Sequence, residues 1–434
     1  MAAELLPSDV LELILRRLTP SPRSLAACRR VCKEWRAVVD AHCPPPHPDL
    51  LPLSLAGIFL AQFFFEHEYL PDFFGPRDCR HKAGRRIFPK IDYVDDARTP
   101  DLEVIDHCNG LLLMYQHVVN PATRRWPCCD EYLVFDPTVS PHYEVFSIPG
   151  SFLFNPDSTV ESVVRQLEWP PSPFVVNVYS SATGRWEKRS LARRGEAAGT
   201  VADVLHSPPT SANHLYGVTW RGVLYVQMNN GDVIRISLSD DKYQVIKSPS
   251  DIDMNHSPYI YLGKSEKTVY CASIEHYKNH QRLQVFLLHE LHRDGDDPIE
   301  WILIHDVSLD QIMADFRWNP EAAEPWIQHD MDGSSHNEEE MSKDDESPGW
   351  NSEDDSIVYT ADMVGWGTNG STCIVGFHPF REIIFLYSSC WLNKVRAYHL
   401  HNSKVEVLGT YSLGGGDEIG QSFPYTPCWI GDLS

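Results

Sequence analysis

Four histidines stand in two pairs whose spacing could suit metal ligands. His289 and His292 form HELH and lie three positions apart, whereas the zinc motif HExxH separates its histidines by four on one helix face. They also lie in a strand-like segment, where alternation turns such residues apart. His399 and His401 share one strand face, but no third ligand is evident, so we interpret them as exposed polar residues. We therefore expect no metal site.

Glycines and cysteines form two further patterns that carry chemistry in other proteins. Gly365, Gly367 and Gly370 spell GxGxxG, which binds dinucleotide phosphates only between a strand and a helix N-terminus. The segment that follows, STCIVGF, is typical of a strand, so we expect a turn instead. Cys28 and Cys32 are four positions apart on one predicted helix, with no further ligand nearby, and we assign them to core packing.

No sequence motif of nucleotide hydrolysis, acyl transfer or thiol catalysis occurs in the chain. We therefore expect no catalytic residue and no cofactor. We therefore expect the function to depend on loops that bind a partner and on the elements that position those loops.

Composition limits the class of protein. The chain has 434 residues, which is more than a single core usually holds, and its 32 prolines and 25 glycines predict many short elements. The formal charge of -23 argues against binding to nucleic acid or to an anionic membrane. No apolar run is long enough to span a membrane, and the first residues lack the order of a signal peptide. Eleven cysteines without a CxxC pair favour a reducing compartment, so we expect an intracellular protein of the cytoplasm or nucleus.

The first 42 residues predict three short helices. Pro20 and Pro22 end the first helix, and the CPPPHP segment ends the last, leaving 43–50 as a proline-rich linker. Three helices of this size bury too little apolar surface to be very stable alone, so we expect them to bind a partner. The alternative is a helical cap that packs on the domain behind it.

The residues of these helices resemble the F-box, whose pattern is Leu-Pro, a helix ending in Arg-Leu, then Ser-Leu and Val-Cys-Lys-x-Trp-Arg. The matching residues, in order, are Leu6, Pro7, Asp9, Leu18, Ser24, Leu25, Val31, Cys32, Lys33, Trp35 and Arg36. The resemblance implies binding to the Skp-type adaptor of an SCF ubiquitin ligase and, through the adaptor, to a cullin. It assigns the adaptor contact to Leu6, Pro7, Leu11, Ile14, Leu18, Leu25, Val31, Cys32 and Trp35.

Residues 51–434 predict a large all-β domain. Segments rich in β-branched and aromatic residues recur between turn signals. They are GLLLMY, YLVFD, YEVFSI, FVVNVYS, LYGVTW, VLYVQM, DVIRISL, TVYCASI, LQVFLL, WILIHDV, TCIVGF, IIFLYS and KVRAYHL. Between VLYVQM and DVIRISL, the pair Asn230-Gly231 predicts a hairpin with a two-residue type I′ turn.

A repeat of strand, polar turn and aromatic strand favours a β-propeller. Its aromatic anchors are Trp126, Trp186, Tyr243 and Trp301, at steps of 60, 57 and 58 residues, and HNSKVEVLGTY is a weaker fifth copy. This length suits a propeller unit somewhat longer than the usual ~40 to 50 residues. Segments 50–106 and 421–430 are candidates to make or close a further unit. A β-sandwich or an irregular all-β domain is the alternative.

The same region resembles the F-box-associated domain of plant F-box proteins, which is similar to kelch propellers. The segments that carry the resemblance are CNGLLLMY, NPATRRWP, YLVFDPTVSPHYEVFSIP, YSSATGRWEKRS and ISLSDDKYQVIKSP. It implies that the domain holds a protein target for degradation. The target and the loops that bind it are not encoded in any motif.

An acidic stretch at 329–356 interrupts this domain. Between Asp330 and Asp355 there are eleven acidic residues and one lysine, so we expect a solvated, disordered insertion. Two functions remain open for the whole chain. One is a substrate receptor of a ubiquitin ligase; the other is a propeller scaffold or ligand-binding protein with a degenerate F-box and no role in ubiquitination.

Overall fold

The computed structural model describes the β region of the chain in segments. They are residues 55–63, 72–76, 104–114, 117–119, 121, 132–136, 140, 142–148, 164–206, 216–228, 230–256, 258–265, 267–277, 280–290, 299–309, 324–329, 372–389, 393–413 and 418–427. The predicted helical module, the linker, the GxGxxG segment and all but the first residue of the acidic stretch lie outside these ranges.

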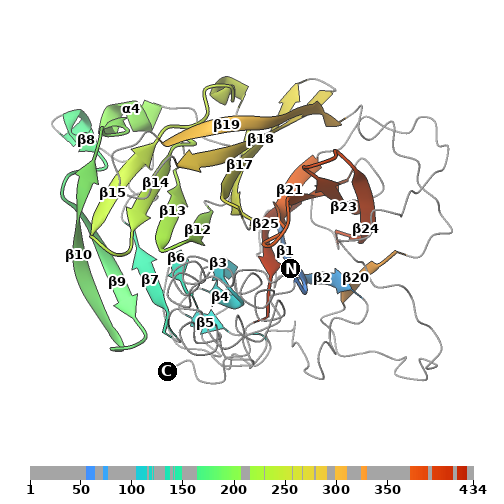
Figure 1. Cartoon of the computed structure of the whole chain (residues 1–434), viewed down its shortest axis with the longest axis horizontal. Coiled ribbons are helices and arrows are strands. Elements are labelled where there is room, and N and C mark those ends of the chain that lie inside the picture. The colour runs from blue at the N-terminus through green and yellow to red at the C-terminus, as the bar shows by residue number, and fades with distance from the viewer. Residues whose placement is uncertain are drawn as a thin grey trace, which may run out of the picture.

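The described part is mostly β-structure in a propeller-like arrangement of antiparallel units around a common centre (Figure 1). The first unit has the strand order β20-β2-β1-β25 and joins both ends of the described chain. Its strands are β1 (Gly57–Phe63), β2 (Asp72–Pro76), β20 (Trp326–His329) and β25 (Glu418–Tyr425). Pairing of β1 with β25 closes the arrangement. β1 lies in the candidate segment 50–106 and β25 overlaps the candidate segment 421–430.

Two more units follow along the chain. The three-stranded unit contains β3 (Val104–Cys108), β4 (Leu111–Met114) and β5 (His117–Val119). The next contains β6 (Tyr132–Val134), β7 (Glu144–Ser147), β9 (Phe174–Ser180) and β10 (Arg185–Arg194). In β9, residues 174, 176 and 178 are buried while 175 and 177 are exposed, which is the alternation expected of a half-buried strand.

Three four-stranded units complete the arrangement. Their strands are β12 (Gly217–Trp220), β13 (Val223–Gln227), β14 (Val233–Ser237) and β15 (Lys242–Ile246); β16 (Tyr259–Lys264), β17 (Val269–Tyr277), β18 (His280–Glu290) and β19 (Ile299–Ser308); and β21 (Thr372–Phe377), β22 (Ile383–Ser388), β23 (Lys394–His399) and β24 (Val405–Thr410). β10 and β15 pair in parallel at Ala192–Arg194, which joins two units at their outer edges.

Short elements lie beside the outer strands β10 and β15, where Arg193 and Tyr243 both donate hydrogen bonds to the Pro170 carbonyl. They are β8 (Glu168–Trp169), β11 (Gly199–Thr200), the helix α4 (Val201–His206), and the 3₁₀ turn η3 (Val164–Gln166); a second 3₁₀ turn, η4 (Met254–His256), precedes β16. A capping box begins α4, because the Thr200 hydroxyl accepts the Asp203 N–H (3.1 Å) and the Asp203 carboxylate accepts the Thr200 N–H (2.8 Å).

The innermost strands contact one another around the centre. β12 contacts β3, β6 and β16, β16 contacts β21, and β21 contacts β25. Their carboxyl ends lie together: a Cβ on Gly263 of β16 would meet the ring of Phe377 in β21, and one on Gly376 would meet Pro424 in β25. The inner strands therefore run in one direction and end on one face.

Every strand segment that the sequence predicted contains an observed strand, so the prediction of a mostly β region is confirmed. The hairpin between β13 and β14 is also present, but its predicted turn type is wrong. Gly231 has a φ of 81°, whereas Asn230 does not take a positive φ, and Met228 and Asp232 enclose three residues rather than two. This geometry matches a longer turn that ends in a left-handed glycine.

Turns with two positive φ angles occur instead between the first two strands of two units. They are Asn109-Gly110 (45° and 90°) and Arg221-Gly222 (50° and 77°). Both join an innermost strand to its neighbour, β3 to β4 and β12 to β13.

The repeated aromatic residues lie on the outermost strands of successive units. Trp186 is in β10, Tyr243 in β15 and Trp301 in β19, so each repeat spans the third strand, a turn and the fourth strand of its unit. Their environments differ: Trp186 is 46% exposed, Tyr243 is buried, and the Trp301 indole donates a hydrogen bond to the Lys247 carbonyl (3.0 Å). Trp126 lies outside the described residues.

Candidate functional site

The residues that the sequence assigns to adaptor binding, from Leu6 to Trp35, all lie outside the described residues. The structure therefore does not bring them together or separate them. The structure describes the β region, and the geometry of its strands defines the candidate sites below.

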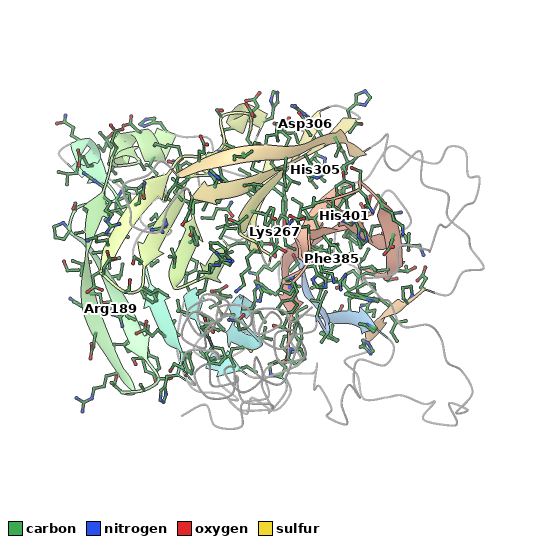
Figure 2. All side chains as sticks on the ribbon, viewed as in Figure 1. Arg189, Lys267, His305, Asp306, Phe385 and His401 are labelled. Atoms are coloured by element: carbon green, nitrogen blue, oxygen red, sulfur yellow. The ribbon has the colours of Figure 1, made fainter. Side chains whose placement is uncertain are left out.

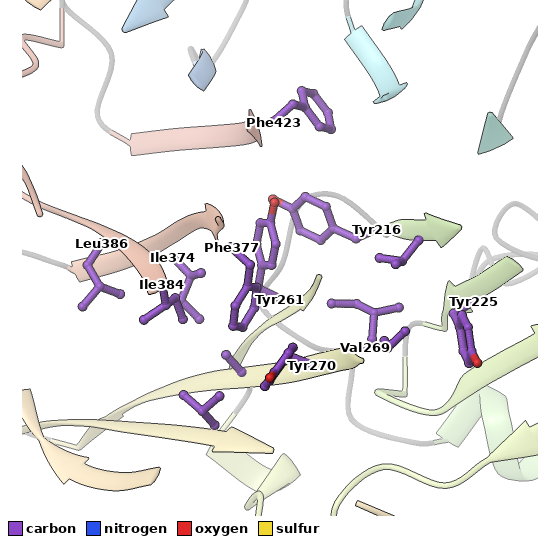
Figure 3. Close-up of a cluster of buried hydrophobic side chains, with 14 of the residues drawn as sticks. Tyr216, Tyr225, Tyr261, Val269, Tyr270, Ile374, Phe377, Ile384, Leu386 and Phe423 are labelled. Carbon is purple, nitrogen blue, oxygen red and sulfur yellow. The ribbon is translucent and has the colours of Figure 1, made fainter. Parts of the chain in front are cut away.

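Aromatic rings fill the space where the innermost strands meet (Figure 3). The rings of Tyr216 and Tyr261 lie 4.0 Å apart between centroids, and Tyr261 also contacts Phe377 at 6.1 Å. The Tyr216 ring lies 6.5 Å from that of Phe423 in β25. Burial raises the pKa of Tyr216 to about 12, so its phenol stays neutral at physiological pH. Among the described residues, this centre is a packed hydrophobic core.

Asp106 in β3 is a buried carboxyl group with a strongly raised pKa, a property that catalytic acids and bases often share. Burial raises its pKa to about 8, although hydrogen bonds from the backbone N–H groups of Leu133 and His107, both 2.7 Å, act in the opposite direction. Its two carboxyl oxygens each accept one of these hydrogen bonds, and the bond to Leu133 joins β3 to β6. We therefore assign Asp106 a structural role between two inner strands.

The histidine patterns do not assemble a metal site in the described part of the chain, where no group of three or more potential ligands occurs. His289 lies in β18, whereas its predicted companion His292 lies outside the described residues. The interpretation of His399 as an exposed residue is wrong. Its side chain is buried and lies 3.3 Å from the Glu406 carboxylate across β23 and β24, because both inward-facing groups need a polar partner.

Among the described residues, no helix is long and apolar enough to cross a membrane.

Several charged side chains on the outer surface form ion pairs within or between neighbouring units; Arg189, Lys267 and Asp306 are labelled in Figure 2. Arg189 of β10 pairs with Glu144 of β7, and Lys267 lies 2.6 Å from Glu382 across two units. Asp306 of β19 receives two hydrogen bonds from Arg282, at 2.5 and 2.7 Å between nitrogen and oxygen. In each of these pairs the positive and negative charges compensate each other, so the pairs give no indication of a ligand.

Further polar contacts occur where β3, β12 and β16 end. Lys264, the last residue of β16, donates from its Nζ to the Thr219 carbonyl of β12 at 2.7 Å. The next two residues of β12 and its turn, Trp220 and Arg221, stack on each other, with the guanidinium carbon 4.3 Å from the ring centroid. Asn109, in the turn after β3, donates from its side-chain amide to the Phe135 carbonyl at 2.6 Å. We call Asn109, Trp220, Arg221 and Lys264 the inner-strand rim.

The inner-strand rim is cationic within an acidic protein. Lys264 lies close enough to Asp106 and Cys108 for its positive charge to oppose the rise that burial causes in both their pKa values. Arg221 adds a second positive charge on the same rim.

The sequence contained a signal for this site that its motifs did not reveal. Arg221-Gly222 stands between the predicted strand segments LYGVTW and VLYVQM, a two-residue spacing that favours a tight hairpin. A basic residue at a turn position that favours Asn or Gly is the feature that distinguishes it.

Comparison with known proteins identifies the N-terminal module. A family model described as F-box-like matches residues 3–43. The chain is also similar to F-box protein At5g07610 of Arabidopsis thaliana, with 21% identity over 349 residues, which cover 71% of this chain and 72% of the relative. That similarity extends well beyond the matched N-terminal segment. The chain thus carries an F-box-like domain followed by a mostly β region that it shares in part with a plant F-box protein.

Proposed function

We propose that this protein is a substrate receptor of an SCF-type ubiquitin ligase. The observation that carries the proposal is the F-box-like domain at residues 3–43 in front of a separate, mostly β region. In this proposal the F-box-like domain binds a Skp-type adaptor, and through it a cullin, while the β region holds a protein target. The protein then acts inside the cell.

The mechanism that we propose is proximity. A receptor that holds its target next to the ligase raises the effective concentration of target lysines at the loaded conjugating enzyme. This chain then needs no catalytic residue, because the covalent transfer belongs to its partners. The packed aromatic centre and the hydrogen-bonded Asp106 support a binding role over an enzymatic one.

The alternative function, a scaffold or ligand-binding protein with a degenerate F-box, predicts no adaptor binding. The test is a pull-down of recombinant Skp-type adaptor by the full chain and by a triple variant, Leu6→Ala, Pro7→Ala and Trp35→Ala. Trp186→Ala is the matched control, because it removes an exposed tryptophan of the β region. Circular dichroism of each variant separates loss of binding from loss of fold.

We expect the full chain and the control to retain the adaptor and the folded triple variant to lose it. Absence of binding by the full chain would overturn the proposal. A ubiquitination assay on captured targets then separates a degradation receptor from an F-box scaffold that leaves its partner intact.

A further inference from the structure

We propose that the outer edge of β10 binds an extended, acidic segment of the target protein as an additional strand. This edge consists of Arg185–Leu191 and the side chains that lie beside them, and we call it the β10 edge. The identity of the ligand as a target rests on the proposed receptor function. Binding of an acidic strand to the β10 edge does not depend on that function.

The backbone of β10 is paired on one side along most of its length. On its inner side, β10 pairs with β9 from Arg185 to Leu191. On its outer side it pairs with β15, at Ala192–Arg194. Among the described residues, no strand pairs with the outer side of the seven residues before Ala192. The edge therefore has room for one further strand, which would end where β15 begins to pair.

Alternation along β10 determines which backbone groups point outward. Ala192 donates its N–H to the Asp241 carbonyl, just before β15, at 2.9 Å, so its backbone groups face away from β9. The residues of an antiparallel strand alternate between facing the partner strand and facing away from it. Trp186, Lys188 and Ser190 thus direct their N–H and C=O groups outward, where an extended peptide can form main-chain hydrogen bonds with them.

The side chains of the same three residues form an exposed face. Trp186 lies opposite Tyr179 of β9, with ring centroids 5.6 Å apart, and Ser190 lies opposite Val175. Trp186 is 46% exposed and Val175 is 45% exposed, which makes them two of the five exposed large apolar side chains in the described part of the chain. Directly opposite residues of an antiparallel pair share a face, so both apolar side chains lie on the face that an added strand would extend. Tryptophan is also enriched among the residues that dominate binding energies.

The charge of β10 selects an acidic partner. From Arg185 to Arg194 the strand carries five cations and one acidic residue, a net charge of +4 in a chain with a formal charge of -23. Three of these cations form ion pairs with neighbouring carboxylates. Arg185 and Lys188 are exposed, and neither has an acidic partner among the described residues. Carboxylates on an added strand would lie beside these two cations, and cross-strand pairs of opposite charge are stabilising.

The same charge disfavours a second copy of this chain as the occupant. Antiparallel pairing of two β10 edges centred on Lys188 places its ammonium opposite that of the other copy, and pairing centred on Arg189 does the same for the guanidinium. Like charges directly opposite each other are destabilising, and lysine on an edge strand is a common protection against self-pairing. A segment of opposite charge is not subject to this repulsion.

The acidic stretch of the chain itself is a competing occupant. It follows His329 of β20, and Figure 1 shows β20 and β10 on opposite sides of the arrangement. This separation favours a segment of another protein. A variant in which the acidic residues from Asp330 to Asp355 are replaced by their amides separates the two occupants.

The test measures binding of a fluorescein-labelled peptide of alternating threonine and glutamate, as long as the β10 edge, to the full chain by fluorescence anisotropy at near-physiological salt. A second peptide of the same sequence has a methyl group on every backbone nitrogen, which removes its N–H donors and keeps its charge. Trp186→Ala removes the exposed ring and Lys188→Gln removes one cation. Both positions are exposed, so we expect the fold to be retained. Lys267→Gln is the matched control, because it removes an exposed cation of another unit, away from Arg189 of β10 (Figure 2).

We expect saturable binding of the unmethylated peptide to the full chain and no measurable binding of the methylated one. The affinity should be about tenfold weaker for Trp186→Ala, about three- to fivefold weaker for Lys188→Gln, and changed by less than about twofold for Lys267→Gln. The acidic-stretch variant should bind the peptide as the unchanged chain does.

Four results would overturn the proposal. The full chain fails to bind the peptide, the methylated peptide binds equally well, or Lys188→Gln and Lys267→Gln weaken binding alike, and the last two of these would indicate general electrostatic attraction. Tighter peptide binding by the acidic-stretch variant would assign the β10 edge to the chain's own stretch. Equal binding of a single-stranded oligonucleotide, also weakened in Lys188→Gln, would likewise overturn it in favour of a nucleic-acid site.

The adaptor pull-down on the same preparations separates this proposal from the receptor role. We expect Trp186→Ala to keep the adaptor and bind the peptide weakly, and the triple variant of the F-box-like domain to do the reverse. Loss of peptide binding with intact adaptor binding in the full chain would remove the β10 edge as a site and leave the receptor role. Peptide binding without adaptor binding would keep the β10 edge and remove the ligase.

Discussion

Tyr261 in β16 donates a hydrogen bond from its phenol to the backbone carbonyl of Ser422 in β25, at 3.2 Å and across 161 positions of the chain. Both residues are buried. Because β25 also pairs with β1, this hydrogen bond connects the closing unit to the unit of β16. The C-terminal strand is thus attached to the arrangement on two sides.

Tyr261→Phe is expected to lower the free energy of unfolding by about 1–3 kcal/mol, because the aromatic ring is retained while a buried carbonyl loses its donor. Urea denaturation of the full chain measures the change. Tyr179→Phe is the control, since Tyr179 is only partly buried, at the outer part of its sheet. Equal stability of Tyr261→Phe and the unchanged chain would show that the hydrogen bond contributes nothing net.

Gly376 in β21 marks a close approach of two inner strands. A Cβ at this position would lie 2.3 Å from Cγ and 2.8 Å from Cδ of Pro424, whose ring cannot move without its backbone. The φ of 137° adds strain for any other residue. Gly376→Ala is therefore expected to lower the free energy of unfolding by at least about 2–3 kcal/mol.

Gly184→Ala separates backbone strain from the steric clash with Pro424, the two effects that Gly376→Ala combines. Gly184 also has a positive φ, 65°, but no atom lies within 4 Å of the position that a methyl group would take there. We expect a loss of about 1–2 kcal/mol from backbone strain alone. Equal losses for the two glycine variants, measured by urea denaturation, would contradict a steric role for Pro424.

The outer hairpins were predictable from sequence because each repeats the same local pattern. In YSSATGRWEKRS, the small turn residues at 181–184 separate an alternating strand from an aromatic one, and the structure forms β9, a turn and β10 there. The closing strand β25 gives a weaker signal because EIGQSFPY contains glycine and proline. Pro424 is tolerated there because β25 pairs with β1 on one side only, which leaves its missing N–H without consequence.

The inner-strand rim was not predictable, because it is assembled from three strands that are distant in sequence. Lys264 reaches Thr219 across 45 positions, and no local pattern records that contact. Periodicity predicts which residues of one strand are buried, but it does not predict which strands become neighbours. Asp106 illustrates the same limit, since its partner Leu133 belongs to another unit.

Lys394 of β23 forms a largely buried ion pair with Glu324, the carboxylate of which also accepts the Thr410 N–H at 2.8 Å. Burial raises the pKa of Glu324, but the hydrogen bonds from Lys394 and Thr410 outweigh it and lower that pKa below its usual value. Lys394→Met leaves a partly buried carboxylate without its cation, and we expect a loss of about 1–3 kcal/mol at pH 7.

Lys267→Met is the matched control for Lys394→Met, because Lys267 forms an ion pair with Glu382 while its side chain is 68% exposed. We expect a change below about 1 kcal/mol for this surface pair. The lowered pKa of Glu324 means that its contribution is present above the unfolded pKa and is lost as pH falls through the folded pKa. The difference between Lys394→Met and the unchanged chain should therefore shrink in acid, and a constant difference would argue against the ion pair.

Asp106 gives the stability of the protein a pH dependence of the opposite sign. Its pKa is about 8 in the folded chain and near its usual value of 3.8 in the unfolded chain. Below both values the carboxyl group is protonated in both states and contributes no slope. Between pH 4 and 8 the unfolded chain has released this proton while the folded chain retains it, so the free energy of unfolding falls as pH rises. One proton limits the slope to about 1.4 kcal/mol per pH unit.

Asp106→Asn removes the titration and keeps an oxygen for only one of the two backbone donors, so its own cost is constant with pH. The quantity to measure is the difference in free energy of unfolding between the unchanged chain and Asp106→Asn, by urea denaturation at steps from pH 5 to 8. We expect the variant to gain stability relative to the unchanged chain as pH rises. Asp136→Asn, at a partly exposed position after β6, is the control for the removal of a carboxyl group elsewhere in the chain. Parallel curves for the unchanged chain and Asp106→Asn would mean that the buried carboxyl group keeps an ordinary pKa, stabilised by its two N–H donors, and that Lys264 then faces a negative charge at neutral pH.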